Sequence, residues 1–96
     1  TLFRSNIYYI ESQGHTLILH TILGDYETTG TMKEMEEKLA DMNFCRGNKG
    51  YLINLAHVDG ITDGYAMVKG ERLVLSRARK KEFMEELTKY WGEVIK

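Results

Sequence analysis

Short apolar runs separated by turn residues set the pattern of hydrophobic and polar positions near the start of the chain. Residues 7–12 (IYYIES) and 15–23 (HTLILHTIL) are rich in β-branched and aromatic side chains, and residues 12–14 (SQG) lie between them. This pattern predicts two strands joined by a turn. In the second run both alternating faces are largely apolar, so we expect both to be covered. Residues 24 and 25 (Gly-Asp) then predict a tight turn that returns the chain as a third strand.

Helical spacing replaces the alternation at residue 31. Thr31 and Glu34 form the T-x-x-E pattern of a capping box, in which each side chain bonds an amide of the first helical turn. Met32, Met35 and Leu39 recur on one face, and charged residues occupy the remainder. We therefore predict a helix of roughly ten residues that covers a sheet.

A second group of strands follows a predicted loop over residues 41–50. The apolar runs predicted as strands are residues 51–55, 58–62, 65–69 and 72–76. Asp63 and Gly64 separate two of these runs and form a strong hairpin signal, so we expect a β-meander.

A C-terminal helix completes the pattern. Ser76 is placed to cap this helix. Its apolar positions keep helical spacing at Phe83, Leu87, Tyr90 or Trp91, and Val94. The order strands, helix, strands, helix predicts an α+β fold, predominantly β, with antiparallel sheets, one short central helix and a C-terminal helix.

Composition limits the class of protein. The chain has 96 residues, of which 43% are hydrophobic and 28% charged, so it can bury a core as one globular domain over residues 1–96. It contains no apolar run long enough to span a membrane and no pattern of a secretory signal near its start. Cys45 is the single cysteine, which excludes an internal disulfide and a CxxC metal site. We expect a cytoplasmic protein without a cofactor or metal.

The charges are unevenly distributed along the chain. Residues 1–45 carry a net charge of -4, residues 46–81 carry +5 and residues 82–96 carry -2, within a total of -1. Four cations in the run 76–83 (SRARKKEF) stand at the start of the predicted last helix, where they oppose the helix dipole. Such a local conflict indicates a functional demand, and it favours an anionic partner.

One set of residues at fixed spacing resembles a known family. Residues 44–61 contain F-x-R-x-x-K-x-Y-L-I-N-L-x-x-V-x-x-I, and Ser76, Arg77 and Phe83 follow. This set resembles the LytTR DNA-binding domain of bacterial response regulators over nearly the whole chain. The resemblance implies an elongated arrangement of β-sheets with few helices, whose loops enter successive major grooves of double-stranded DNA. It also implies sequence-specific transcription regulation in a two-component system.

The resemblance further implies the partners of the chain. Two copies would bind as a dimer to direct or imperfect repeats and bend the DNA. The 96 residues contain no receiver domain, so we expect either a domain excised from a longer regulator with an N-terminal receiver domain, or a regulator that receives its signal otherwise. The family's first strand usually starts earlier, so residues 1–3 are expected to be only the end of that strand.

By this resemblance, three segments face DNA. Their candidate residues are His15 and Thr16 in the first, Arg46, Asn48, Lys49 and Gly50 in the second, and Ser76, Arg77, Arg79 and Lys80 in the third. Lys and Arg neutralise phosphates, and Arg, Lys and Asn can also read base edges in the major groove. Gly47 and Gly50 are expected to let the backbone approach phosphates.

The chain departs from the family at two positions. Many members carry His-Arg-Ser or His-Asn-Ser where this chain reads Asn48-Lys49-Gly50, so a hydroxyl contact to phosphate is missing and a different target sequence is expected. Ala78 stands where members can place a base-contacting arginine, which leaves Arg77 and Arg79 as alternatives.

Other residues have plainer interpretations. Without the resemblance, His15 is an ordinary turn residue, and His20, His57 and Asn54 are expected to be hydrogen-bonded structural residues. The acidic helix at residues 33–38 is expected to be solvated and directed away from DNA. No pattern of an active site is present, so we expect a non-enzyme. The alternative function is a protein-interaction module that binds an acidic or peptide partner through a sheet edge.

Overall fold

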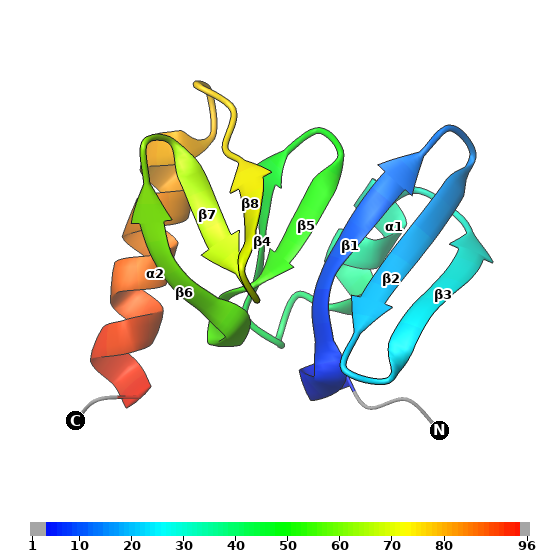
Figure 1. The fold of residues 1–96 in the computed structure, drawn as a ribbon, viewed down its shortest axis with the longest axis horizontal. Coiled ribbons are helices and arrows are strands. Elements are labelled where there is room, and N and C mark those ends of the chain that lie inside the picture. The colour runs from blue at the N-terminus through cyan, green and yellow to red at the C-terminus, as the bar shows by residue number, and fades with distance from the viewer. Residues whose placement is uncertain (1–3, 95–96) are drawn as a thin grey trace.

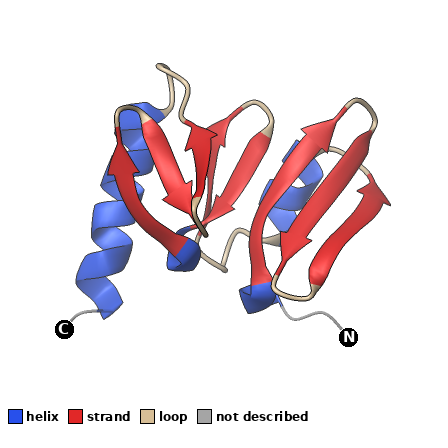
Figure 2. Ribbon diagram, in the orientation of Figure 1, coloured by secondary structure: helices blue, strands red, loops and turns tan. Residues whose placement is uncertain are grey.

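The computed structural model describes residues 4–94, which form two antiparallel sheets and two α-helices (Figure 1, Figure 2). The predicted α+β, predominantly β fold is confirmed. Residues 1–3, expected to end the family's first strand, lie outside the described residues. No helix within residues 4–94 is long and apolar enough to cross a bilayer.

The larger sheet has five strands in the order β3-β2-β1-β5-β4. These strands are β1 (Ile7–Gln13), β2 (Thr16–Thr21), β3 (Gly24–Thr29), β4 (Phe44–Asn48) and β5 (Tyr51–Asn54). The smaller sheet consists of β6 (Val58–Thr62), β7 (Tyr65–Val68) and β8 (Glu71–Val74). The helices are α1 (Met32–Lys38) and α2 (Lys80–Val94), with short 3-10 helices η1 (Arg4–Asn6) and η2 (Leu55–His57).

Two adjacent inner strands of the larger sheet, β1 and β5, bury side chains on both faces. Tyr9 of β1 pairs with Ile53 of β5, and beside them Ile10 pairs with Leu52. Successive side chains of a strand point to opposite faces. Tyr9 and Ile53 accordingly belong to a core shared with the smaller sheet and α2, whereas Ile10 and Leu52 belong to a core with residues of α1. Burial on both faces explains why these strands are nearly continuous apolar runs.

The predicted capping box of α1 is confirmed. The Thr31 hydroxyl accepts a hydrogen bond from the Glu34 amide at 3.1 Å, and the Thr31 amide donates to the Glu34 carboxylate at 3.0 Å. Met32 and Leu39 are buried, so this face covers the sheet as expected. The helix has seven residues and is shorter than its pattern predicted.

The predicted loop over residues 41–50 is wrong in its central part, because β4 forms there and pairs with β5. Pairing and packing across the sheet outweigh the polar, glycine-containing composition that favoured a loop. The register shifts at Gly47, which marks a β-bulge. Residues 41–43 remain a turn before β4, and Lys49 and Gly50 form the turn after it.

Three further boundaries differ from the prediction. The turn between β2 and β3 is formed by Ile22 and Leu23 instead of the next two residues. β5 pairs with β1 in the larger sheet, so the meander begins only at β6. α2 begins at Lys80 rather than directly after Ser76. The Ser76 amide donates to the Gly47 carbonyl at 2.8 Å, which holds this residue against β4 before the helix can start.

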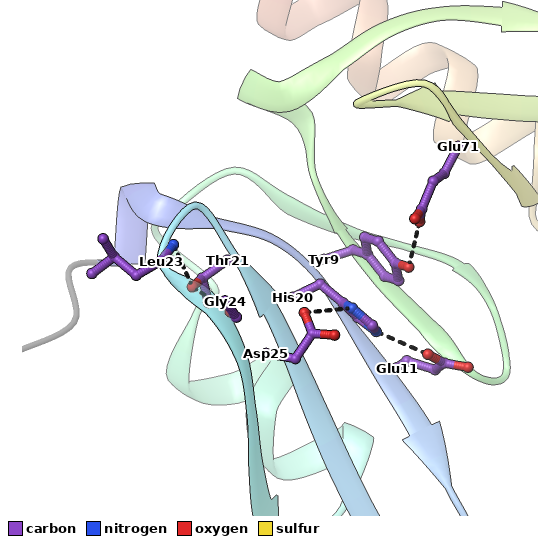
Figure 3. Close-up of polar contacts among 8 residues, drawn as sticks. All are labelled: Tyr9, Glu11, His20, Thr21, Leu23, Gly24, Asp25 and Glu71. Carbon is purple, nitrogen blue, oxygen red and sulfur yellow. Dashed lines mark hydrogen bonds and ion pairs between the residues drawn. The ribbon is translucent and has the colours of Figure 1, made fainter.

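A polar cluster joins the two sheets (Figure 3). The Tyr9 hydroxyl donates to the Glu71 carboxylate of β8 at 2.9 Å, and the His20 ring stacks on Tyr9 with ring centroids 4.2 Å apart. The ring nitrogens of His20 lie 2.9 Å from Glu11 and 3.0 Å from Asp25. Burial and the neighbouring Glu71 raise the pKa of Tyr9, so its hydroxyl stays a hydrogen-bond donor. His20 therefore has the structural role predicted for it.

Candidate nucleic-acid interface

Three turns lie along one edge of the molecule, at the top of Figure 1. They are the β1–β2 turn with His15, the β4–β5 turn with Lys49 and the β8–α2 connection with Arg77, and all three residues are exposed. The turns are spread along the longest axis of the molecule, whose Cα extent is 34 Å. The three segments predicted from the sequence are thus brought together on one side.

Backbone hydrogen bonds connect neighbouring turns. The Ser12 amide at the end of β1 donates to the Gly50 carbonyl of the β4–β5 turn at 2.9 Å. The Ser76 amide after β8 donates to the Gly47 carbonyl of β4 at 2.8 Å. Because these groups are main-chain atoms, the backbone of the sheets fixes the relative position of the turns.

Arg46 lies under the β4–β5 turn. Its Nε donates to the Asn48 carbonyl at 3.2 Å, and its Nη2 donates to the Lys49 carbonyl at 2.9 Å. Its Nη1 lies 2.6 Å from a carboxylate oxygen of Glu36 on α1, and only 13% of the Arg46 side chain is exposed. The guanidinium is thereby engaged within the protein.

Asn48 uses both ends of its side-chain amide within the protein. Its Nδ2 donates to the Val74 carbonyl at 2.6 Å, and its Oδ1 accepts from the Gly50 amide at 2.7 Å. In the second segment, the residue left exposed at the tip is Lys49. Arg46 and Asn48 shape the turn that presents it.

The two glycines of this segment have different roles. A Cβ on Gly50 would meet the Asn48 Oδ1 at 3.6 Å, an ordinary contact, so this position is open. A Cβ on Gly47 would lie 2.7 Å from Ile53 Cδ1 and 3.0 Å from Leu75 Cδ2. Gly47 is buried, so the expectation that it lets phosphates approach is wrong: the core beneath the bulge has no room for a side chain.

The third segment presents its cations around the start of α2. Arg77 and Lys80 are exposed, and the Ser76 carbonyl accepts from the amides of Arg79 at 3.1 Å and Lys80 at 2.9 Å. Arg79 is half-buried, and its charge opposes the rise in pKa that burial causes at Cys45. Arg77 is therefore the more accessible of the two arginines considered for the third contact.

The first segment carries less charge. His15 and Gly14 form the tip of the β1–β2 turn, and Gly14 has a φ of 62°, which a glycine adopts without strain. Thr16 begins β2, where it pairs with Gln13 of β1 and Thr29 of β3 and is half-buried. His15 is thus the more accessible of the two residues predicted here.

Polar residues assigned to structure keep that role. The Asn54 Nδ2 donates to the Ile7 carbonyl at 2.9 Å, and its Oδ1 accepts from the Ala56 amide at 3.0 Å, as its position in an apolar strand predicted. His57 Nε2 lies 2.7 Å from the Ser5 carbonyl. Neither side chain belongs to the edge of three turns.

Sequence reasoning missed two carboxylates at the site. The pattern places Glu36 on a solvated helix face, but its partner is Arg46, ten residues later on another element, and no local spacing reveals such a pair. Asp63 is in the predicted and confirmed β6–β7 turn, and this turn lies at the same edge (Figure 1). Its neighbour Gly64 accepts from the Leu75 amide at 3.0 Å, which ties this turn to the β8–α2 connection.

Two comparisons with known proteins found a match. The family model described as the LytTr DNA-binding domain matches residues 2–88. No curated protein matches the sequence. A similar solved structure is described as the LytTr DNA-binding domain of a methyl-accepting/DNA response regulator from Bacillus cereus; it is 20% identical, has a TM-score of 0.78, and the match covers 86% of this chain and 82% of that chain. At this identity the likeness shows the fold.

The family model covers most of the chain, which confirms the resemblance found in the sequence. The matched domain is a DNA-binding domain and not a catalytic one. The chain belongs to the LytTR family of DNA-binding domains.

Proposed function

We propose that this chain is one LytTR domain over residues 1–96 that binds specific sites in double-stranded DNA by inserting three turns into successive major grooves. These are the β1–β2 turn, the β4–β5 turn and the β8–α2 connection. The observation that carries the proposal is their common position along one edge with exposed tips at His15, Lys49 and Arg77.

The size of this edge supports the proposal. The turns are spread along an axis with a Cα extent of 34 Å. One helical turn of B-DNA is about 34–36 Å long, so the whole molecule is about as long as one turn of the duplex, and an edge on this axis can follow one face of the DNA. The β framework between the turns keeps their spacing.

Within this proposal the candidate residues divide into two groups. The first group contacts phosphates or base edges, because its side chains are exposed and can reach the DNA; it consists of His15, Lys49, Arg77 and Lys80. Arg46 and Asn48 act on the turn, since their polar groups bond within the protein. Thr16, Gly50, Ser76 and Arg79 are partly covered and border these contacts.

The wider setting follows from the family. We infer a bacterial transcription regulator of the cytoplasm, in which a receiver domain outside this chain controls binding. Two copies occupy neighbouring direct or imperfect repeats as a dimer on DNA and bend it. Half-site spacing measured in selected binding sites tests this arrangement, because two copies require repeats at a fixed distance.

Selection of binding sites from a random pool of duplex DNA tests the proposed function directly. Lys49→Ala and Arg77→Ala should weaken binding to the selected site more than Lys33→Ala, which removes an exposed cation from α1. The logarithm of affinity should fall linearly with the logarithm of salt concentration, and each lost phosphate contact should reduce the slope by about 0.9. Equal affinity of the three variants contradicts the proposal.

A second function has one observation in its favour. β3 is an edge strand of the larger sheet, and all six of its residues are exposed, Tyr26 among them. Such an edge can bind a peptide by strand addition. Titration with random duplex DNA at low salt separates the two functions, because a peptide-binding module would give no binding there.

A further inference from the structure

We propose that Glu36 of α1 is a positioning residue for DNA recognition, since it holds Arg46 in place under the turn that presents Lys49. Glu36 is not one of the exposed residues at the tips of the turns, and it acts on the β4–β5 turn through Arg46. The proposal rests on the proposed DNA binding and adds the residue on which the shape of the central turn depends.

A single guanidinium connects the helix to the turn. Arg46 Nη1 lies 2.6 Å from Glu36 Oε1, while Nε and Nη2 of the same group donate to the carbonyls of Asn48 and Lys49 at 3.2 and 2.9 Å. The guanidinium is rigid and planar, with donors in a fixed fork. Three of its nitrogens are therefore engaged in three directions, one of them toward α1.

This arrangement fixes the direction of Lys49. Two successive carbonyls of the turn point at the guanidinium, which sets the orientation of both peptide planes and of the Lys49 side chain between them. A turn that already has its bound shape loses less conformational entropy on binding DNA. Glu36 contributes by keeping the guanidinium at this position when phosphates, its competing anionic partners, approach.

The direction in which DNA affinity changes when the Glu36 charge is removed distinguishes a positioning role from simple electrostatic repulsion. A carboxylate near a polyanion repels it, so its removal should raise affinity for any DNA if charge alone matters. If Glu36 positions the turn, Glu36→Gln should lower affinity for the selected site by about tenfold, the loss expected when one good base contact is displaced. Affinity for random DNA should stay the same or rise, so the specificity ratio falls.

Glu37 provides a matched control. It follows Glu36 in α1, carries the same charge and is exposed. Within residues 4–94 its carboxylate has no ion pair. Glu37→Gln should leave affinity for the selected site unchanged or raise it slightly.

Three additional measurements distinguish positioning from a merely structural effect. The Gly50 amide donates to Asn48 Oδ1 inside the turn, so its hydrogen exchange in the free protein should speed up in Glu36→Gln while exchange in the core of β1 stays slow. Glu36→Asp, which retains the charge, should recover part of the specificity. Arg46→Lys should lose affinity for the selected site as Glu36→Gln does, and the double variant should be no weaker than Arg46→Lys alone.

Different results would overturn the role of Glu36 and the proposed DNA binding. Binding of Glu36→Gln to the selected site as tight as that of the unaltered chain, or tighter, overturns the proposal, and so do additive losses in the double variant. If the unaltered chain fails to discriminate any site from random DNA, the proposed function fails. Amide hydrogen exchange at Gly50 in the free protein still shows whether Glu36 holds the turn. A failure of the proposed function can therefore be distinguished from a failure of the proposed role of Glu36.

Discussion

The side-chain amide of Asn48 donates a hydrogen bond of 2.6 Å to the carbonyl of Val74, which ties the last residue of β4 to the last residue of β8. The two strands belong to different sheets. This bond therefore sets the position of the β4–β5 turn relative to the β8–α2 connection, and a change in it should affect both stability and recognition.

Asn48→Ala removes this bond and the one from the Gly50 amide. The expected loss is about 1–2 kcal/mol in the free energy of unfolding, because each net hydrogen bond is worth about 1 kcal/mol. Specific DNA affinity should fall as well. Urea unfolding and binding titration measure the two effects. Asn48→Asp is the partial control, since it keeps the acceptor for the Gly50 amide and loses the donor to the Val74 carbonyl. If Asn48→Ala unfolds and binds DNA like the unaltered chain, the bond to Val74 contributes to neither stability nor recognition.

Gly47→Ala should destabilise the fold by about 1–3 kcal/mol, the usual range for overpacking a core. The added Cβ would lie 2.7 Å from Ile53 Cδ1 and 3.0 Å from Leu75 Cδ2, so both side chains must shift. Gly60→Ala is the control, because its Cβ would meet nothing within 4 Å and its effect on the unfolded chain is the same. Thermal unfolding measures the midpoints of the Gly47→Ala and Gly60→Ala variants. Equal midpoints would show that the added Cβ at Gly47 does not overpack the core.

The thiol of Cys45 should react slowly with alkylating reagents in the folded protein. Burial raises its pKa from 9.0 to about 11, with a smaller contribution from the carboxylates of Glu82 and Glu86. At pH 8 the thiolate fraction, and hence the reaction rate, should be about 100-fold lower than in the unfolded chain. Mass spectrometry of carbamidomethylated protein, with and without denaturant, measures this ratio.

The raised pKa of the Cys45 thiol also makes stability depend on pH. Because the folded state retains the Cys45 proton at a pH where the unfolded state loses it, the free energy of unfolding should decrease as pH rises from about 9 to 11. Cys45→Ala should lack this component of the pH dependence. A variant with the same profile as the unaltered chain would contradict the assignment.

Local patterns predicted the elements that local interactions form. The Thr31 and Glu34 capping box lies within one helical turn, and Asp63-Gly64 forms its hairpin from adjacent residues. The predicted tips at Lys49 and Arg77 are also exposed, and they lie on the same edge. Spacing along the chain is enough for the capping box and the hairpin, whereas the tips at Lys49 and Arg77 were implied by the resemblance to LytTR domains.

Long-range contacts decided the features that the sequence did not reveal. β4 has a polar composition, and only its pairing with β5 and its packing under Leu75 make it a strand. The role of Arg46 depends on Glu36 of α1, and that of Asn48 depends on Val74, which is 26 residues away. A residue type that suits DNA contact also suits bonding to carbonyls, so the sequence alone leaves both roles open.

Asp63→Asn should raise affinity for DNA. Asp63 is exposed in the β6–β7 turn, which reaches the edge formed by the β1–β2 turn, the β4–β5 turn and the β8–α2 connection (Figure 1). Its φ is 49°, a left-handed conformation that asparagine also tolerates, so the change removes a charge with little strain. One carboxylate fewer beside the phosphates should raise affinity by about two- to fivefold at low salt, and this gain should shrink as salt screens the repulsion.

Asp41→Asn separates this local effect from a change in net charge. Asp41 is exposed in the turn over residues 39–43, and this connection between α1 and β4 lies away from the edge of the three turns (Figure 1). Both variants change the net charge equally, so equal gains in a titration at several salt concentrations would mean that DNA responds only to overall charge. A gain in Asp63→Asn alone locates the duplex at the edge where His15, Lys49 and Arg77 are exposed. A loss in Asp63→Asn would contradict this prediction, because removal of a carboxylate beside phosphates should reduce the repulsion between protein and DNA.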